Sequence, residues 1–286
     1  MKLLSVVIPT WNRRTLLHEA LCSVLACELP EGWDIEVIIA DDGSTDGTLN
    51  MVEDVARKDG RVRPLALSHC GFPGAVRNRG VEGAMGSIIA FLDSDDMWAP
   101  EKLIRQLPLH EHESVMVSHT REVWLRDAHE VSQAGQRHRR SGTIFSDALR
   151  KCVIGPSTVM IDTDLYRRSG GFREDLEIAE DYEFWLRLTA VVEVHYIDEP
   201  LTVKRAGGWP QLSLKYDHIE GFRIEGLKNL VDIGFFSSRC DTATQHAAVR
   251  ELARKMRLFA RGARKRGRYA EAITLEEEAD KYLEME

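Results

Sequence analysis

The chain has 286 residues, 43% of them hydrophobic and 29% charged, with a formal net charge of −8. This composition predicts a globular protein with one large domain and an appendage, and the acidic balance argues against a nucleic-acid partner. No apolar run approaches the roughly 20 residues that a membrane span needs. The five cysteines lack metal-ligand spacing. Their odd number, and an N-terminus without a signal-peptide cleavage site, predict a cytoplasmic protein.

Apolar runs alternate with amphipathic segments in the N-terminal part of the chain. The predicted strands are 4–8, 35–40, 62–67 and 88–92, and the predicted helices lie around 17–25, 49–58 and 74–84. Strands and helices that alternate with short connections are typical of a mostly parallel, doubly wound sheet with helices on both faces. The predicted fold class is therefore α/β.

Polar side chains follow three of these strands at the point where each strand ends. Pro9 and Thr10 end the first, Asp41 and Asp42 end the second, and the acidic run Asp93–Asp96 follows the last. Ligands of such sheets bind at the carboxyl ends of the strands, so we expect the three groups to converge on one site. Clustered carboxylates disfavour each other's ionisation, and their oxygen atoms suit Mg²⁺ or Mn²⁺. On its own, the acidic run could equally be a solvated turn.

The order of the motifs resembles that of family 2 glycosyltransferases. The matching segments are the opening strand with Pro9-Thr10, Asp42–Asp46, Ala75–Asn78, Phe91–Asp96 and Glu180-Asp181. The resemblance covers about residues 3–205. It implies a GT-A fold in a catalytic domain at 1–205, followed by a flexible flap and C-terminal helices at 206–286.

The resemblance also implies an activity. Such an enzyme would move a sugar from a nucleotide-diphosphate sugar, usually a UDP-sugar, to the hydroxyl of a saccharide, lipid-linked or other acceptor, with inversion and with Mn²⁺ or Mg²⁺ as cofactor. Its product would belong to cell-surface polysaccharide or glycoconjugate synthesis. The chain lacks the Gln-x-x-Arg-Trp motif and the membrane helices of processive members, which points to the transfer of single sugars.

Roles for individual residues follow from the same resemblance. Asp181 would be the catalytic base, with Glu180 as second choice and a helix N-cap as its structural alternative. Asp96 would be the direct metal ligand, and Asp95 would hold the ribose or assist the metal. The metal would neutralise the charge on the leaving diphosphate. Asp93 would brace the turn.

The remaining assignments concern the nucleotide. Asp42 would accept a hydrogen bond from the base, and Pro9 and Thr10 would line the base pocket through backbone contacts. Arg77 would pair with the diphosphate, with a surface ion pair as the alternative.

Three other classes of protein remain open from the sequence alone. A receiver domain also binds Mg²⁺ through acids after its strands, but it would end near residue 125 and leave Glu180-Asp181 unexplained. A sugar nucleotidyltransferase needs a Gly-rich, Arg-containing loop where this chain has Pro9–Asn12. The third class is a non-catalytic module that binds a nucleotide sugar. Only the presence of all the acidic residues named above argues against it.

The second half of the chain is less regular. We predict strands at 115–125, 156–161 and 201–205, a polar loop at 126–141, a helix over 181–188, and a flap at 206–213 that contains Trp209.

Two terminal helices with a turn near Gly267 are predicted beyond the flap. Residues 250–268 carry nine basic side chains and one acid, and residues 276–286 carry six acids and one base. The plainer interpretation is a helical hairpin that covers the core or a dimer partner. The sharper one is a basic face that docks on an acceptor or on the inner face of an anionic membrane.

Overall fold

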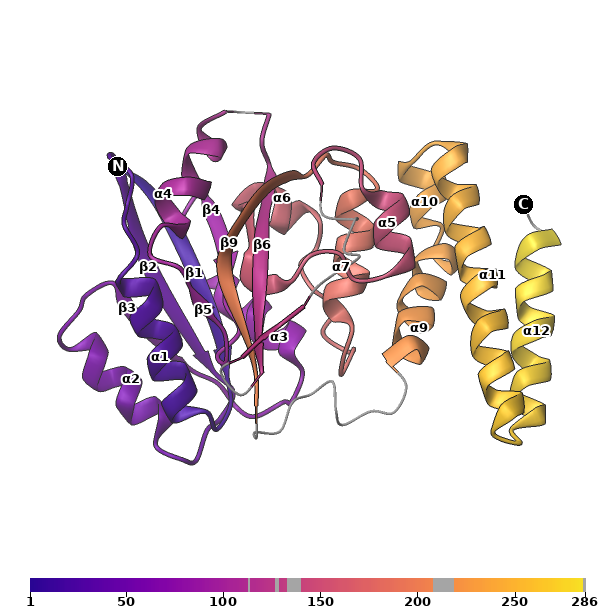
Figure 1. The fold of residues 1–286 in the computed structure, drawn as a ribbon, viewed down its shortest axis with the longest axis horizontal. Coiled ribbons are helices and arrows are strands. Elements are labelled where there is room, and N and C mark those ends of the chain that lie inside the picture. The colour runs from indigo at the N-terminus through magenta and orange to yellow at the C-terminus, as the bar shows by residue number, and fades with distance from the viewer. Residues whose placement is uncertain (113, 127–128, 133–139, 208–218, 285–286) are drawn as a thin grey trace.

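The computed structural model describes residues 1–112, 114–126, 129–132, 140–207 and 219–284. Its N-terminal part alternates strands and helices as predicted (Figure 1). The elements are β1 (Lys2–Thr10), α1 (Arg14–Leu25), β2 (Trp33–Asp41), α2 (Thr48–Ala56), β3 (Val62–Ala66), α3 (Pro73–Glu82) and β4 (Ile88–Phe91). The α/β class is therefore confirmed.

The second part adds five strands to the same sheet: β5 (Met97–Trp98), β6 (Val117–Arg126), β7 (His129–Val131), β8 (Val159–Asp162) and β9 (His195–Ala206). The order is β3-β2-β1-β4-β8-β6-β9-β5, with β7 paired to β6. The pairs among β1 to β4 are parallel, and so is β6/β9. The other pairs are antiparallel. The sheet is thus mixed beyond β4, because the helical crossovers that parallel neighbours require occur mainly among the first four strands.

Two predicted loops lie partly outside the described residues. In the loop expected at 126–141, residues 129–131 form β7, and residues 133–139 are not described. The flap expected at 206–213 is described only at its first two residues, so Trp209 lies outside the description.

Helices make up most of the remaining chain. They are α4 (Lys102–Gln106), η1 (Leu107–Glu111), α5 (Phe145–Arg150), η2 (Pro156–Thr158), α6 (Thr163–Arg168), α7 (Glu180–Thr189), α9 (Ile219–Asp232), α10 (Phe235–Arg239), α11 (Thr242–Lys265) and α12 (Tyr269–Glu284). The helix predicted over 181–188 is α7. Its N-cap is Ala179, in the left-handed conformation with φ 66°, so Asp181 is not the cap.

Both faces of the central strands are buried. Leu4, Val6 and Ile8 of β1 belong to the core that also contains the buried side of α1. Val7 points to the opposite face and belongs, with Phe91, to the core that reaches α7, α9 and α11. This alternation follows from the two-residue period of a strand, and burial on both faces explains the continuous apolar runs in the sequence.

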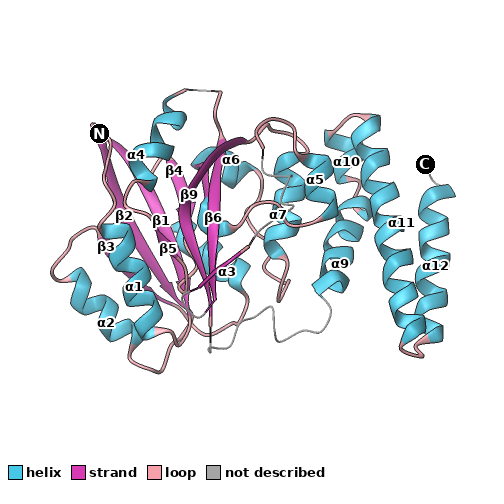
Figure 2. Cartoon of the chain, in the orientation of Figure 1, coloured by secondary structure: helices cyan, strands magenta, loops and turns pink. Residues whose placement is uncertain are grey.

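The C-terminal helices α11 and α12 pack side by side at the end of the molecule far from β3 (Figure 2). Small buried side chains at Ala260, Ala263 and Ala272 line their contact, and the turn between them contains Gly267 with φ 76°. The predicted pair of helices with a turn at this glycine is present. Among the described residues, no helix combines the length and apolarity needed to span a bilayer.

Candidate active site

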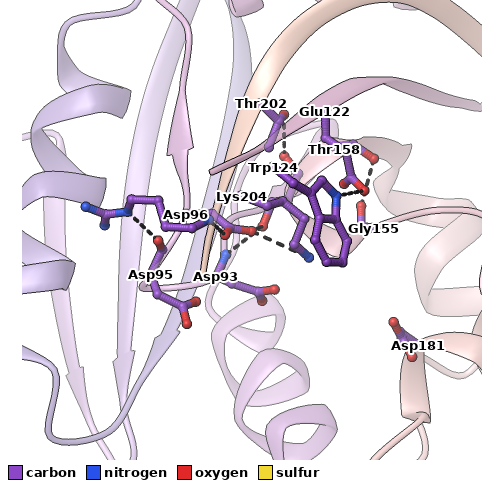
Figure 3. Close-up of polar contacts among 12 residues, drawn as sticks. Asp93, Asp95, Asp96, Glu122, Trp124, Gly155, Thr158, Asp181, Thr202 and Lys204 are labelled. Carbon is purple, nitrogen blue, oxygen red and sulfur yellow. Dashed lines mark hydrogen bonds and ion pairs between the residues drawn. The ribbon is translucent and has the colours of Figure 1, made fainter. Parts of the chain in front are cut away.

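The acidic turn after β4 lies at the edge of the sheet where the parallel strands end (Figures 1 and 3). Each of its three carboxylates has a basic partner: Arg77 Nη2 lies 2.7 Å from Asp93 Oδ1, Arg13 Nη1 lies 2.6 Å from Asp95 Oδ2, and Lys204 Nζ lies 3.7 Å from Asp96 Oδ2. Side chains from three separate parts of the chain therefore supply positive charge to this cluster.

Asp96 is turned into the protein interior. Its side chain is 2% exposed. Oδ2 accepts a hydrogen bond from Ser157 Oγ at 2.6 Å, and Oδ1 accepts one from the Arg205 backbone N–H at 3.3 Å. Burial raises the pKa of Asp96 to about 7, although Lys204 acts in the opposite direction. The role of Asp96 as a direct metal ligand stays a prediction, and in this structure both of its oxygens have partners inside the protein.

Asp93 and Asp95 keep part of their carboxylates at the surface, with side chains 24% and 19% exposed. Within the described part of the chain, no group of three or more His, Cys, Asp or Glu side chains is arranged to hold a metal ion. The two outward carboxylates nevertheless suit an ion such as Mg²⁺, which commonly takes one or two protein carboxylates and completes its shell with water and phosphate oxygens.

Arg77 links the acidic turn to the start of α7. Its Nη1 donates to Glu180 Oε1 at 2.5 Å, its Nη2 donates to Asp93 Oδ1 at 2.7 Å, and its guanidinium lies 5.4 Å from the ring centroid of Phe172. The side chain is 6% exposed, so the surface ion pair considered from the sequence is wrong. Burial opposes the charge of Arg77, but Asp93 and Glu180 outweigh it and raise its pKa.

Asp181 is carried by the first turn of α7, apart from the acidic turn (Figure 3). Its Oδ1 accepts a hydrogen bond from the Tyr182 backbone N–H at 2.7 Å, and its Oδ2 lies 3.2 Å from the Cys152 thiol. Burial raises the pKa of Cys152 well above its ordinary value, and Asp181 adds to the effect. The thiol therefore stays protonated and donates to the carboxylate. Nothing in the sequence around Cys152 indicated this contact.

Asp42 organises a neighbouring loop. Its Oδ1 accepts the backbone N–H of Cys70 at 2.8 Å, and its Oδ2 accepts that of Gly71 at 2.9 Å. His69 Nδ1 lies 2.8 Å from the same Oδ2. Both oxygens of Asp42 are thus engaged by residues 69–71.

The neighbouring Asp41 is different. Asp41 and Thr10 are register partners at the ends of β2 and β1. Asp41 Oδ1 and Thr10 Oγ1 are buried and have no hydrogen-bond partner among the described residues. Trp11 follows Thr10, is 50% exposed, and stacks on His69 with ring centroids 4.5 Å apart. Two unsatisfied oxygens beside an exposed ring would suit a planar heterocycle that carries a ring N–H.

Comparisons with known proteins define the class. The model of the family described as "Glycosyl transferase family 2" matches residues 5–169. An uncharacterized glycosyltransferase of Rickettsia felis is 32% identical over 204 residues, which cover 71% of this chain and 33% of that protein. The chain thus spans about a third of that relative. The putative teichuronic acid biosynthesis glycosyltransferase TuaG of Bacillus subtilis is 32% identical over 188 residues, covering 65% of this chain and 71% of TuaG.

A third relative is the UDP-Glc:alpha-D-GlcNAc-diphosphoundecaprenol beta-1,3-glucosyltransferase WfaP of Escherichia coli. It is 30% identical over 189 residues, covering 66% of this chain and 70% of WfaP. Among solved structures, S. aureus TarS 1–349 in complex with UDP-GlcNAc has a TM-score of 0.71 and 24% identity, covering 90% of this chain and 72% of that one. The mannosyltransferase PcManGT from Pyrobaculum calidifontis, in complex with GDP-Man and Mn²⁺, has a TM-score of 0.58 and 20% identity, covering 98% and 86%.

These matches confirm the GT-A type of α/β fold that the sequence predicted. The chain belongs to glycosyltransferase family 2. Membership of this family sets aside the receiver-domain and nucleotidyltransferase interpretations.

Proposed function

We propose that this enzyme transfers a single sugar from a UDP-sugar to an acceptor hydroxyl, with inversion of the anomeric carbon. The observation that carries the proposal is the arrangement of groups at one edge of the sheet. Thr10 and Asp41, with their unsatisfied oxygens, lie at the ends of β1 and β2. The acidic turn follows β4, and Asp181 lies apart from it on α7. An acceptor whose hydroxyl is hydrogen-bonded to Asp181 would then approach the anomeric carbon from the side opposite the diphosphate.

The base pocket would be built from the ends of β1 and β2. Asp41 Oδ1 would accept the ring N–H of uracil, with Trp11, Pro9 and Thr10 lining the pocket. We assign base recognition to Asp41 instead of Asp42, since both oxygens of Asp42 already accept backbone N–H groups. Asp42 would shape the pocket by holding residues 69–71. The UDP-sugar in the name of WfaP and the UDP-GlcNAc in the TarS complex support a uridine donor.

Asp95, with Asp93 beside it, would hold Mn²⁺ or Mg²⁺ at the diphosphate. The ion, when bound, would neutralise the charge that develops on the leaving group. The Mn²⁺ in the PcManGT complex supports this cofactor. Asp96 would serve the site from inside, by fixing Lys204 and the backbone of Arg205 through the contacts described above.

Asp181 would accept the proton of the acceptor hydroxyl as the new glycosidic bond forms. A thiol is a weak hydrogen-bond donor, so an acceptor hydroxyl could replace Cys152 at Oδ2 at little cost. Arg77 would be a positioning residue, because it connects Glu180, the neighbour of the base, to Asp93 of the donor site. In a single displacement the acceptor oxygen bonds to the anomeric carbon as its bond to the diphosphate breaks and the base takes the proton. This inverts the anomeric carbon, so an α-linked donor would give a β-linked product.

The proposed acceptor belongs to cell-surface polysaccharide synthesis and is attached to a lipid diphosphate. TuaG is named for teichuronic acid biosynthesis, and the WfaP name specifies a diphosphoundecaprenol-linked saccharide. Such an acceptor would place the enzyme at the inner face of the membrane.

A panel of nucleotide sugars, titrated by calorimetry with and without Mn²⁺, tests the donor. We expect UDP and one UDP-sugar to bind with Mn²⁺ and to bind much more weakly after EDTA. The stereochemistry is then read from the anomeric coupling constant of the product in proton NMR. If UDP, GDP and TDP all fail to bind or to raise the melting temperature with metal present, the donor site is assigned wrongly.

A further inference from the structure

The end of the α11–α12 hairpin carries a dense group of positive charges. Five of the eight residues from 261 to 268, here called the basic tip, are Arg or Lys: Arg261, Arg264, Lys265, Arg266 and Arg268. Arg264 pairs with Glu276 and Arg268 pairs with Glu271. The other three form no ion pair with any residue that the structure describes. Five basic side chains less two paired acids leave three positive charges at the tip, on a chain whose net charge is −8.

Exposed apolar side chains adjoin these charges. Tyr269 and Ile273 occupy the first turns of α12, four residues apart and so on one face of the helix, and they are 61% and 46% exposed. All five basic residues of the tip are exposed as well. A local combination of Lys and Arg with an aromatic and a branched aliphatic side chain is typical of segments that lie in the interface of an anionic membrane.

The tip points in the same direction as the active-site edge. In Figure 1 the parallel strands β1 and β2 end toward the lower side of the molecule, and the turn between α11 and α12 also lies at that side. The N-terminus and the beginning of α11 lie at the upper side. A flat surface that contacted the basic tip would therefore lie on the side of the molecule where β1 and β2 end.

We propose that the basic tip binds the headgroups of anionic lipids and holds the catalytic edge toward the membrane surface. The benefit of this lipid binding for catalysis rests on the proposed function, since a lipid-linked acceptor would be presented at the membrane surface. The lipid binding itself does not depend on the proposed function. A second copy of the chain is a less suitable partner for the basic tip than a lipid surface. A stable protein interface buries about 800 Å² on each partner, whereas the exposed tip consists only of the end of α11 and the turn 266–268 before α12.

The proposal is tested by sedimenting the full chain with vesicles. We expect it to bind phosphatidylcholine vesicles that contain about a third phosphatidylglycerol at about 0.1 M salt. Binding should be lost with phosphatidylcholine alone and reduced at about 0.5 M salt, where charges are screened. Because each basic side chain at such a surface contributes about a fivefold increase in partitioning, the double variant Lys265→Gln/Arg266→Gln should bind at least about tenfold more weakly.

A matched variant controls for net charge. Lys2→Gln/Arg105→Gln removes two exposed positive charges from the upper side of the molecule, at the start of β1 and on α4. This variant should bind vesicles as the wild type does, and both variants should keep the wild-type melting temperature. Equal losses in both variants would show a general charge effect and overturn the proposal, as would wild-type binding by Lys265→Gln/Arg266→Gln.

Two further measurements separate the remaining outcomes. Sedimentation equilibrium without lipid should find the same oligomeric state for wild type and Lys265→Gln/Arg266→Gln; self-association that depends on the tip would assign it to a second copy and overturn lipid binding. UDP affinity, measured without vesicles, should be equal in all three proteins. A chain that binds vesicles but not UDP would support lipid binding and contradict the proposed function. A chain that binds UDP but not vesicles would support the proposed donor and contradict lipid binding.

Discussion

Asp181 shows how one residue can be tested for chemistry apart from folding. Asn at this position keeps the size of the side chain and an oxygen that can accept the Tyr182 N–H, but it removes the basic carboxylate. We expect Asp181→Asn to fold and to bind UDP normally, while the transfer rate falls at least about 100-fold, the low end for loss of a general base. Initial rates and calorimetry on the same preparation measure both quantities.

Asp95→Asn is the matched control, because it removes another partly exposed carboxylate, one that we assign to the proposed donor site. There we expect metal-dependent UDP binding and transfer to fall together. Transfer at nearly the wild-type rate by Asp181→Asn would place the base elsewhere, with Glu180 as the next candidate. Loss of folding would make Asp181 chiefly a structural residue.

The adjacent acids Asp41 and Asp42 differ in the partners that their oxygens have. Asp41 Oδ1 is buried and unsatisfied within the described structure, and Asp42 has no oxygen without a partner. We therefore expect Asp41→Ala to weaken UDP binding by about 1–3 kcal/mol, the cost of a missing buried hydrogen-bond partner. Calorimetry with UDP measures the change.

Asp42→Ala is the comparison for this prediction. It should lower the melting temperature, since the backbone N–H groups of Cys70 and Gly71 lose their acceptor, and it should affect UDP binding indirectly through residues 69–71. If Asp41→Ala binds UDP with wild-type affinity and Asp42→Ala does not, base recognition returns to Asp42, as the sequence first indicated.

At the scale of elements, Arg77 joins α3 to the turn after β4 and to the start of α7. Replacing it with Met removes the charge and leaves Asp93 and Glu180 without their common partner. Breaking a buried ion pair in this way costs about 3–5 kcal/mol, so urea unfolding should show a large loss of stability.

The kinetics distinguish a positioning residue from a phosphate ligand. If Arg77 positions α7 relative to the donor site, Arg77→Lys should fold better than Arg77→Met and should lose kcat while its KM for the sugar donor stays close to the wild-type value. Exposed Arg79 lies on the same helix and pairs with Glu82, so Arg79→Lys is the control and should change neither quantity. A variant at position 77 with normal stability but a strongly raised donor KM would show contact with the diphosphate.

At the scale of the whole molecule, stability should depend on pH through His110. Burial lowers the pKa of His110 to about 4 from its ordinary 6.5, and its Nε2 lies 2.7 Å from Ser118 Oγ. Between these two values the unfolded chain binds a proton that the folded chain does not. The stability that this histidine supplies is therefore complete above pH 6.5 and is lost as the pH falls toward 4.

Other buried groups titrate in the same range with the opposite sign. Burial raises the pKa of Asp96 and Glu180 to about 7, so the informative quantity is the difference between wild type and His110→Gln. We expect the stability advantage of the wild type over this variant to shrink by about 1–3 kcal/mol between pH 7 and 4.5. Urea unfolding at a series of pH values measures it, and a difference that does not change with pH would contradict the assignment.

Local patterns in the sequence determined the alternation of elements and the residues available for chemistry. The apolar runs of β1, β2 and β4 marked buried strands because a central strand is covered on both faces. The acidic groups after them marked the ligand edge because strand ends in such sheets share one side. The order of five short motifs identified the glycosyltransferase family, and the same local information placed Asp181 in the first turn of α7.

Only the tertiary structure decided what each of these residues contacts. The basic partners of Asp93, Asp95 and Asp96 come from α3, from the loop after β1 and from β9, and no local pattern pairs such distant segments. The choice between Asp41 and Asp42 likewise depends on residues 69–71, which lie beyond β3. The direction of the basic tip depends on how α11 packs against α9 and α10. Periodicity and motifs report on neighbours along the chain, whereas hydrogen bonds, burial and the facing of surfaces depend on neighbours in space.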